Sequence, residues 1–477
     1  MAVKGLKNNK APGVDNIIRN ELLKNGGDCL LEIIRLLCSQ ILSGTDPPWQ
    51  FTTNKVVPVP KKGDLSLMTN YRGISLMSAM AKIYNRLLLN RIRPIVDQIL
   101  RRNQAGFRAG RSTISQIAAL RRLFEGAVSK KLPLVAIFVD FKKAFDSINR
   151  EMLFQIMLAY GIPDQIVAAT RKLYDNSKAM VVVNGKMSET FAITTGVLQG
   201  DTLAPFLFIM VIDYVMSNSE EDFGFIYAKR TSSRHPAKTI NDLDFADDIA
   251  LLENSIALAN KQLQKLALVA KEVGLEINVD KTEYVIYNIN NEEERVILNN
   301  QELKKVDDFR YLGSMMKSTE SDFERRRGLA YGAWNSMEKI WSAKHIPIKL
   351  KVNIFDASVL SILLYGCETW IITPKLEQRI NSFATNCYRQ MLNIKRVDKV
   401  KLDNIYAQVN KRPLINTINK RQLGWLGHTL RRDKDEPTTI LALYEPAVQH
   451  GQAKRGPKSL TYTSQISKLI TGAKSAI

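Results

Sequence analysis

Apolar residues recur along this chain at two different spacings, which predict two kinds of element. Between residues 30 and 41 the apolar positions lie three or four apart, as on one face of an amphipathic helix. The same spacing predicts further helices at about 76–93, 113–129, 147–160, 201–217 and 255–273. Beyond about residue 320 the pattern is helical almost throughout, and basic residues become frequent.

Shorter apolar segments lie between the predicted helices and indicate strands. Residues 134–139 are apolar throughout, which is typical of a buried strand. Residues 179–195 alternate around Asn184 and Gly185, a pair that favours a hairpin turn. Other strands are predicted at 56–63, after 274 and at 309–314, with turns at 70–73 and 106–112. A mixed part followed by a helical part predicts an α+β fold.

The charge balance points to a polyanionic partner. The chain has 477 residues, which predicts two to four domains, and 68 Lys and Arg against 47 Asp and Glu give a net charge of +21. A basic excess of this size favours nucleic acid binding, and the alternative is a solvated basic surface.

Cysteine usage and hydropathy exclude several classes of protein. The four cysteines, Cys29, Cys38, Cys367 and Cys387, form no CxxC pair, so neither a zinc ribbon nor a disulfide framework is predicted. Convergence of Cys367, Cys387 and His428 on a metal is possible, but buried thiols are the favoured interpretation. No signal peptide is visible, and the longest apolar stretch, 203–215, is too short and too interrupted to cross a bilayer. A soluble protein of a reducing intracellular compartment is expected.

Three acids stand where strands are predicted to end. Asp247 and Asp248 lie between two apolar segments within residues 239–253, which predicts a tight hairpin with acid at its turn. Asp140 ends the apolar strand at 134–139 abruptly. Paired acids beside apolar residues are costly unless a cation neutralises them, and oxygen ligands favour Mg²⁺ or Mn²⁺. Three such acids fit a site for two-metal phosphoryl transfer. Asp146 precedes a helix, and a helix N-cap explains it without a metal.

Several ordered blocks resemble the reverse transcriptase of LINE-type non-LTR retrotransposons over about residues 1–345. Residues 10–15 are similar to the family's N-terminal extension, and residues 61–62, 70–75 and 103–108 are similar to its fingers. Residues 138–146, 195–205 and 245–248 are similar to palm motifs A, B and C, in that order. Lys281 lies where motif D has its lysine, and residues 309–313 are similar to the primer grip. Residues 421–431 are more weakly similar to the C-terminal segment of RTE-like elements.

The resemblance implies a right-hand polymerase with fingers, a palm built on an antiparallel sheet, and a helical thumb. Its expected parts are an N-terminal extension at 1–54, fingers and palm at 55–319, the thumb at 320–400 and a basic C-terminal region at 401–477. No segment resembles the family's endonuclease, its cysteine–histidine knuckle, an RNase H domain or a maturase splicing domain, so the chain is expected to lack them.

The resemblance also assigns the catalytic residues. Asp140 and Asp247 are expected to bridge two Mg²⁺ or Mn²⁺ ions, with Asp248 an adjacent or outer ligand. Lys281 is expected to protonate the leaving pyrophosphate as a general acid, and the alternative is a surface lysine.

Further residues are expected to hold the nucleotide and the nucleic acid. Phe145 is predicted to close the space of a ribose 2′-hydroxyl, unless it is simply a core residue, and Phe141 is a further predicted nucleotide ligand. The other predicted nucleotide ligands are Lys61, Lys62, Arg72, Gln199 and Gly200; the predicted nucleic-acid ligands are Arg108, Arg111, Tyr311, Leu312 and Gly313. The alternatives are a helix-entry turn for Gln199 and Gly200 and solvated positions for the basic residues, and the choice between Lys61 and Lys62 stays open.

The expected activity is RNA-directed DNA synthesis, with an RNA template, a DNA primer and deoxynucleoside triphosphates as partners, in the nucleus or cytoplasm. Two alternatives remain open at this level: a nucleic-acid-binding protein with an unused palm, and a group II intron maturase.

Overall fold

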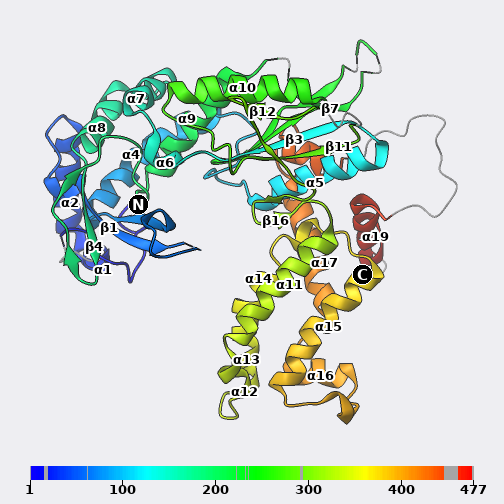
Figure 1. Cartoon of the computed structure of the whole chain (residues 1–477). Helices are drawn as coiled ribbons and strands as arrows, with labels where there is room; N and C mark the ends of the chain where they lie inside the picture. The colour runs from blue at the N-terminus through cyan, green and yellow to red at the C-terminus, as the bar shows by residue number, and fades with distance from the viewer. Residues whose placement is uncertain are drawn as a thin grey trace. The chain divides into compact units, whose positions relative to one another are not determined.

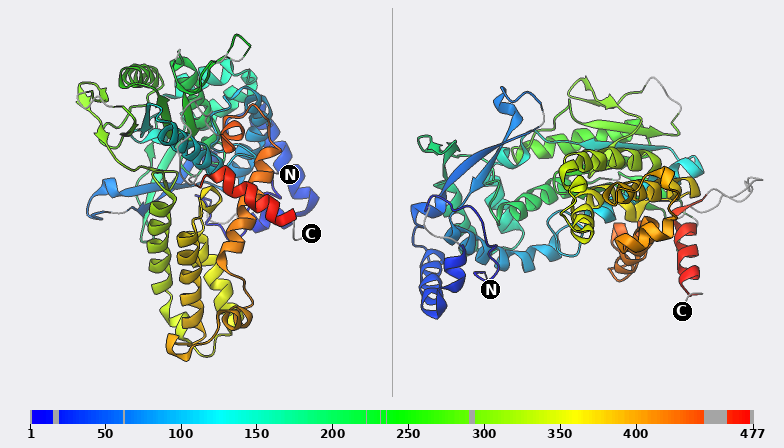
Figure 2. Two further views of the ribbon diagram at one scale, coloured as in Figure 1. Left: turned by 90° about the vertical axis from the view of Figure 1, so that its right-hand side faces the viewer. Right: turned by 90° about the horizontal axis from the view of Figure 1, so that it is seen from below.

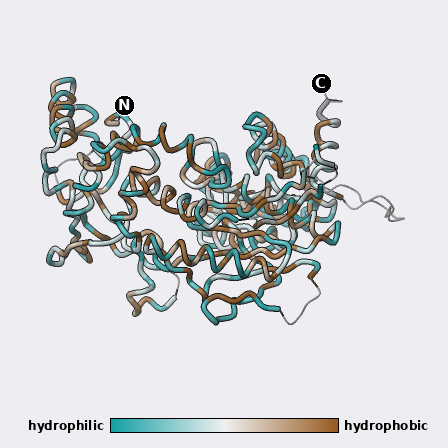
Figure 3. The backbone as a smooth tube through the Cα atoms, turned by 90° about the horizontal axis from the view of Figure 1, so that it is seen from above, coloured by the Kyte–Doolittle hydropathy of each residue, from teal (hydrophilic) through white to brown (hydrophobic). Residues whose placement is uncertain are grey.

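The computed structural model describes residues 2–15, 20–61, 63–221, 223–230, 232–234, 236–289, 294–444 and 460–474 (Figure 1). The chain forms two compact units, and each is assembled from separate chain segments. The first unit comprises Met1–Gly110, Val139–Phe223 and Asn260–Thr282, and the second comprises Arg111–Phe138, Gly224–Ala259 and Glu283–Ile477. Apolar and polar stretches alternate along the helices of both units, as the hydropathy colouring of Figure 3 shows.

The first unit contains a five-stranded sheet. Its strands are β1 (Thr53–Pro60), β2 (Tyr71–Leu76), β4 (Lys178–Val183), β5 (Lys186–Met187) and β6 (Phe191–Ala192). Strand β1 pairs antiparallel with β2 and parallel with β4, and the predicted hairpin around Asn184 is confirmed by the pairing of β4 with β5. The predicted turn at 70–73 is wrong for Tyr71–Gly73, because their backbone continues the ladder with β1, where Gly73 lies opposite Pro58. Asn70 ends a short 3₁₀ helix (Met68–Asn70).

Helices make up the rest of the first unit. They are α1 (Asn20–Asn25), α2 (Gly27–Leu42), α3 (Trp49–Thr52), α4 (Ala79–Ile99), α6 (Ala144–Ser147), α7 (Arg150–Ala159), α8 (Asp164–Asp175), α9 (Ala204–Ser219) and most of α10 (Ile256–Glu272). The predicted N-cap at Asp146 is wrong. Asp146 lies within α6, and Asn149 caps α7, because its side chain accepts from the backbone N–H groups of Glu151 and Met152.

The second unit contains a sheet of order β14-β11-β3-β10-β9. The strands are β3 (Leu134–Val139), β9 (Asp242–Phe245), β10 (Asp248–Glu253), β11 (Glu283–Tyr287) and β14 (Lys304–Lys305). Strand β3 is buried along its whole length, as its apolar sequence predicts, and it pairs antiparallel with β11. Strands β9 and β10 form the predicted hairpin, with Asp248 opposite Phe245.

Helix α5 (Thr113–Lys130) packs on this sheet. Ser112 caps its first turn by accepting from the N–H of Ser115. The apolar side of α5 shares a core with β3, β9, β10 and β11, made of residues that include Ile117, Leu120, Leu123, Phe138, Leu243, Leu252 and Val285. The strand predicted at 309–314 is instead a small hairpin of β15 (Arg310–Tyr311) and β16 (Ser314–Met315), because Leu312 and Gly313 turn the chain with positive φ angles. Short strand pairs β7 (Phe225–Ala228) with β8 (Lys238–Ile240) and β12 (Ile297–Leu298) with β13 (Gln301–Glu302) complete the unit's strands within the described residues.

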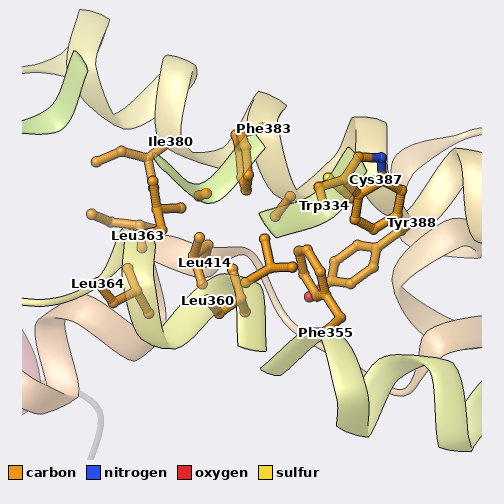
Figure 4. Packing of buried hydrophobic residues seen from close by; sticks show 14 of the residues in the cluster. Trp334, Phe355, Leu360, Leu363, Leu364, Ile380, Phe383, Cys387, Tyr388 and Leu414 are labelled. Atoms are coloured by element: carbon orange, nitrogen blue, oxygen red, sulfur yellow. The ribbon is translucent and has the colours of Figure 1, made fainter. Parts of the chain in front are cut away.

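The chain beyond residue 319 is helical, as predicted. Its helices are α11 (Thr319–Asn335), α12 (Glu338–Ser342), α13 (Ile348–Phe355), α14 (Ser361–Leu363), α15 (Pro374–Met391), α16 (Leu402–Val409), α17 (Leu414–Leu430), α18 (Pro437–Ala442) and α19 (Tyr462–Lys474). Helices α11–α17 pack around one apolar cluster, which includes Trp334, Phe355, Leu363, Ile380, Phe383 and Tyr388 (Figures 2 and 4). Helices α18 and α19 contribute Ala442, Tyr462 and Ile466 to a separate small cluster with Trp425 and Leu426. The interpretation of Trp334, Trp341 and Trp370 as core residues is confirmed, and Cys367 and Cys387 are buried thiols. No helix in the described parts of the chain combines the length and apolarity needed to span a bilayer.

Strand β10 ends with a residue whose carboxyl group is buried, Glu253. The Glu253 side chain is 1% exposed, and its Oε1 accepts from the N–H of Gly224 at 2.7 Å. Burial raises the pKa of Glu253 from 4.5 to about 7.

We therefore expect the second unit to lose stability between pH 4.5 and 7. A carboxyl whose folded pKa is raised favours the folded state fully below its unfolded pKa, and that contribution disappears as pH rises through the folded pKa. The full loss expected in the free energy of unfolding is about 3.5 kcal/mol, since the pKa rises from 4.5 to about 7 and one pKa unit corresponds to about 1.4 kcal/mol. Urea unfolding at pH 5, 6 and 7.5 measures it. Glu253→Gln keeps an acceptor for Gly224 and should flatten the profile; an equally steep profile in this variant would contradict the assignment.

Candidate active site

Asp140 follows directly after β3, and its position is fixed through the backbone of the first unit. Its N–H donates to Thr282 Oγ1 at 3.3 Å, and its carbonyl accepts from the N–H of Asn278 at 2.7 Å. These bonds bring Asp140 beside Lys281, whose Nζ lies 4.0 Å from Asp140 Oδ2. The Asp140 side chain is about half exposed, so it can be reached from solvent. Two predicted catalytic residues that are 141 positions apart are thus neighbours.

Asp247 and Asp248 lie at the turn of the β9–β10 hairpin. Because Asp248 pairs with Phe245, the loop contains only Ala246 and Asp247. Ala246 has a φ angle of 57°, an uncommon conformation for a residue with a side chain, which this tight turn requires. Both acids are exposed. The turn therefore presents two carboxylates to solvent at the start of β10, the strand next to β3.

The electrostatic potential near this turn is negative because several carboxylates lie close together. Tyr311 is buried and donates its hydroxyl to the carbonyl of Leu243 at 3.0 Å. Its pKa lies well above 10, first because of burial and then because the carboxylates of Asp244, Asp248 and Asp242 oppose a further negative charge. Oxygen donors gathered in this way suit a hard divalent cation, which would relieve their repulsion. Within the described residues, no group of three or more His, Cys, Asp or Glu side chains is arranged to hold a metal ion, so the three-acid site stays a prediction.

The segment after Asp140 is hydrogen-bonded to the motif B loop, the part of residues 195–205 that precedes α9. The N–H of Val197 donates to the carbonyl of Phe145 at 2.7 Å, and Thr195 Oγ1 donates to the carbonyl of Asp146 at 3.0 Å. The half-buried Phe145 ring stacks on Phe208 with centroids 4.3 Å apart and planes 11° apart. Phe141 is buried and pairs with Ile277 as an isolated bridge. Helix α9 therefore holds the Phe145 ring in place, and this contact is compatible both with the predicted gate and with a core role.

Gln199 and Gly200 contact the edge of β2. The carbonyl of Gln199 accepts from the N–H of Ser75 at 2.8 Å. Gly200 has a φ angle of 114°, and a Cβ at this position would lie 2.3 Å from the carbonyl oxygen of Ser75. This close backbone contact alone requires a glycine, whatever else Gly200 does.

The predicted triphosphate ligands lie on the β1–β2 ribbon. Arg72 is an exposed residue of β2, opposite Val59. Lys61 directly follows β1, and its Nζ donates to the carbonyl of Thr69 at 3.3 Å. Lys62 lies outside the described residues.

Two buried charged residues that the sequence patterns missed hold the motif B loop. Arg150 donates to the carbonyls of Gly196 at 3.0 Å, Ile193 at 2.8 Å and Thr195 at 3.3 Å. Asp201 accepts from Asn85, Tyr174 and the N–H of Leu203, which fixes the start of α9. No spacing rule identifies either residue, because their partners come from separate elements.

Comparison with known proteins identifies this arrangement. Residues 59–316, more than half of the chain, match the family described as reverse transcriptase (RNA-dependent DNA polymerase). The chain belongs to this family. The proposed LINE-type resemblance and the right-hand α+β fold are confirmed, and the chain is an RNA-directed DNA polymerase by family. The family depends on divalent metal ions.

The relatives are proteins of transposable elements. A transposon-derived protein of Caenorhabditis elegans is 31% identical over 49% of this chain and 86% of its own length. An RNA-directed DNA polymerase from transposon BS of Drosophila melanogaster is 26% identical over 81% of this chain and 44% of its own length. The Pol polyprotein of element R2 from Popillia japonica is 27% identical over 59% of this chain and 38% of its own length. The chain therefore spans less than half the length of the last two relatives.

Among solved structures, apo telomerase from Candida tropicalis aligns with 63% of this chain and 64% of its own length, at 14% identity and a TM-score of 0.39. A similarity at this level does not define any site residue.

Two arginines predicted to bind the template have structural partners in this reverse transcriptase. Arg108 is 8% exposed at its side chain and donates to the carbonyls of Asp97, Arg101 and Gln104, which closes the end of α4. Arg111 lies 3.2 Å from Glu436 and is 11% exposed. Because these groups are buried against protein partners, we do not carry either residue into the proposed nucleic-acid contacts.

The predicted primer-grip residues form a rigid hairpin in the second unit. The carbonyl of Leu312 accepts from the Tyr365 hydroxyl at 2.9 Å, and the carbonyl of Gly313 accepts from Arg325 at 3.0 Å and also from Arg326. The Arg326 guanidinium stacks over the Tyr365 ring at 4.3 Å. Helix α11 thus fixes the tip of the hairpin through residues that the sequence patterns did not single out.

Proposed function

We propose that this reverse transcriptase extends the 3′ end of a DNA primer along the RNA of a non-LTR retrotransposon, with two Mg²⁺ or Mn²⁺ ions held by Asp140, Asp247 and Asp248. The observation that carries this proposal is the strand order of the second unit. Strands β3 and β10 are neighbours in one sheet; β3 leads directly into Asp140, and β10 begins with Asp248. Acids from adjacent strand ends can share a pair of cations.

The residues around these acids support specific roles. Bound metal ions would lower the pKa of the primer hydroxyl and neutralise the triphosphate. Lys281, whose Nζ lies 4.0 Å from Asp140 Oδ2, would donate a proton to the leaving pyrophosphate. The exposed Arg72 and Lys61 supply cationic donors for the triphosphate. The rigid hairpin of Tyr311–Gly313 would hold the primer strand.

The direct test is incorporation of deoxynucleotides on a primed RNA template. We expect DNA synthesis in Mg²⁺ or Mn²⁺ and none above background after addition of EDTA, with recovery when Mg²⁺ is restored. A melting curve in EDTA controls for unfolding. Synthesis that persists without divalent ions, or absence of synthesis on any primed RNA by a folded protein, would refute the proposal.

Phe145 is expected to exclude ribonucleotides. Its ring is fixed by stacking on Phe208, and an apolar wall offers a 2′-hydroxyl no hydrogen-bond partner. Phe145→Val should therefore raise ribonucleotide incorporation relative to deoxynucleotide incorporation by about 100-fold, with little change for deoxynucleotides. The ratio of kcat/KM for the two substrates measures the effect. Phe154→Leu, at a buried aromatic of α7 in the same unit, is the control and should leave discrimination unchanged. An unchanged ratio in Phe145→Val would leave Phe145 with a core role only.

A further inference from the structure

A basic pocket in the second unit lies away from all residues assigned above. It has a volume of about 520 Å³ and is formed where the end of α5 meets the β7–β8 hairpin. Four cationic side chains line it: Lys130, Lys131, Lys229 and Arg230. Among the described residues that line it, none is acidic. Its size is within the range of pockets that bind small ligands or ligand segments.

The walls of the pocket are fixed by hydrogen bonds. The Asn254 side chain joins them, because its Nδ2 donates to the carbonyl of Pro133 at 3.0 Å and its Oδ1 accepts from the N–H of Ile226 at 2.8 Å. The loop after α5 is held from a second direction, since Asn288 Nδ2 donates to the carbonyl of Leu132 at 2.9 Å. Lys131 ends α5 in the left-handed conformation, with φ 52°. Hydrogen bonds therefore fix the wall that carries Lys130 and Lys131 to the strand that leads into Lys229 and Arg230.

The positive charge of the pocket has no counter-charge in the described structure. No ion pair between described residues joins any of the four cations to a carboxylate, whereas many other basic residues of the chain have such partners. The C-terminal end of α5 offers Lys130 a partial negative charge, but this effect amounts to about 0.3–1 kcal/mol and is screened by salt. Four like charges around one cavity repel each other, and an anionic ligand would relieve that repulsion.

The chemistry of the pocket fits a nucleotide unit within a strand. The cations can bind phosphates, and the exposed apolar surface of Pro133 and Ile226 can contact a sugar or base. Asn254 directly follows β10, whereas Asp248 begins it. Six residues of strand at about 3.3 Å each separate the pocket from the acid pair by roughly 20 Å.

We propose that this pocket is a second contact for the RNA template, which binds its phosphate backbone about 20 Å from the acid pair and contributes to affinity and not to the chemical step. The inference rests on the proposed function for the identity of the strand as template RNA. The pocket itself rests on charge and geometry alone.

The test compares Lys229→Gln/Arg230→Gln with a control, Lys304→Gln/Lys305→Gln, which removes two exposed charges from β14 of the same unit. Binding of labelled single-stranded RNA is measured by fluorescence anisotropy over a range of salt concentrations. We expect the pocket variant to weaken binding about tenfold at low salt and to reduce the slope of log K against log salt by about 1.4, since each phosphate contact on a single strand contributes about 0.7. The control and Arg230→Lys should both stay close to wild type.

Primer extension distinguishes this inference from the proposed function. The pocket variant should show a raised KM for template and an unchanged kcat. Wild-type protein that binds RNA through the pocket but synthesises no DNA would refute the proposed function and leave the pocket intact. Equal RNA affinity in the pocket variant and the control would overturn the proposal that the pocket binds RNA. Displacement of RNA by inorganic phosphate beyond the effect of chloride at equal ionic strength would also overturn it, because that result indicates a site for small anions.

Discussion

Asp247→Asn is expected to reduce primer extension by about 1,000-fold, which corresponds to about 4 kcal/mol of lost transition-state stabilisation. The substitution keeps the size of the side chain but removes a negative oxygen ligand at the exposed turn between β9 and β10. A divalent cation binds a neutral amide much less tightly than a carboxylate, so the metal-dependent step should fail first. Because Asp247 is exposed, the variant should fold and melt like the wild type.

RNA affinity separates the catalytic role from a binding role. We expect Asp247→Asn to bind single-stranded RNA within about twofold of wild type, since nucleic acid affinity comes mainly from basic residues. Asp307→Asn, at an exposed acid after β14, is the matched control and should extend primers normally. Normal extension by Asp247→Asn would show that the palm acids are not used, which is the alternative of a nucleic-acid-binding protein with an unused palm.

The largest expected effect on stability is that of Asp322→Ala. Asp322 is fully buried, and its Oδ2 accepts from Arg121 at 2.8 Å and from the indole of Trp370 at 2.9 Å. Its Oδ1 accepts from the N–H of Met315 at 3.0 Å, at the base of the primer-grip hairpin. Removal of this carboxylate leaves the Arg121 guanidinium buried without a counter-charge, which costs about 3–5 kcal/mol. Urea unfolding measures the change in free energy.

A double variant tests whether the stranded charge causes this loss. Arg121→Met/Asp322→Leu removes both charges and fills similar volume, so it should be clearly more stable than Asp322→Ala. Asp322→Asn keeps one acceptor oxygen, for either Met315 or Trp370, and should lie between Asp322→Ala and wild type. A double variant as unstable as Asp322→Ala would show that the hydrogen bonds, and not the unpaired guanidinium, dominate.

Several elements follow from the sequence because their causes are local. The apolar run of 134–139 is buried on both faces, so it needs no alternation to be recognised as a strand. The acid pair lies at a turn because two apolar strands flank it with only two residues to connect them. The end of α10 follows from Gly274, which adopts a φ angle of 83°. The family blocks added the expected order of these elements, and the matched region, residues 59–316, contains the blocks from 61 to 313.

Other predictions failed where a distant partner decided the outcome. Residues 71–73 belong to a segment with the composition of a turn but form a strand, because β1 offers them a complete set of backbone partners. Asp146 is acidic and precedes a helix, yet Asn149 takes the capping position because the chain first makes the short helix α6. The template contact predicted for Arg108 stays a prediction, but its guanidinium donates to carbonyls near the end of α4, contacts that no local pattern indicates.

The sequence by itself therefore determined on which kinds of element the predicted site residues lie, because periodicity, turns and charge act over a few residues; that these residues carry the chemistry stays a prediction. Only the tertiary structure decided what holds them: the contact of Gly200 with Ser75, the bonds of Arg150 to the motif B loop and the pair of Arg121 with Asp322, whose members are 201 positions apart. Such contacts depend on burial and mutual geometry, and no local pattern of residues encodes which buried charge will meet which partner.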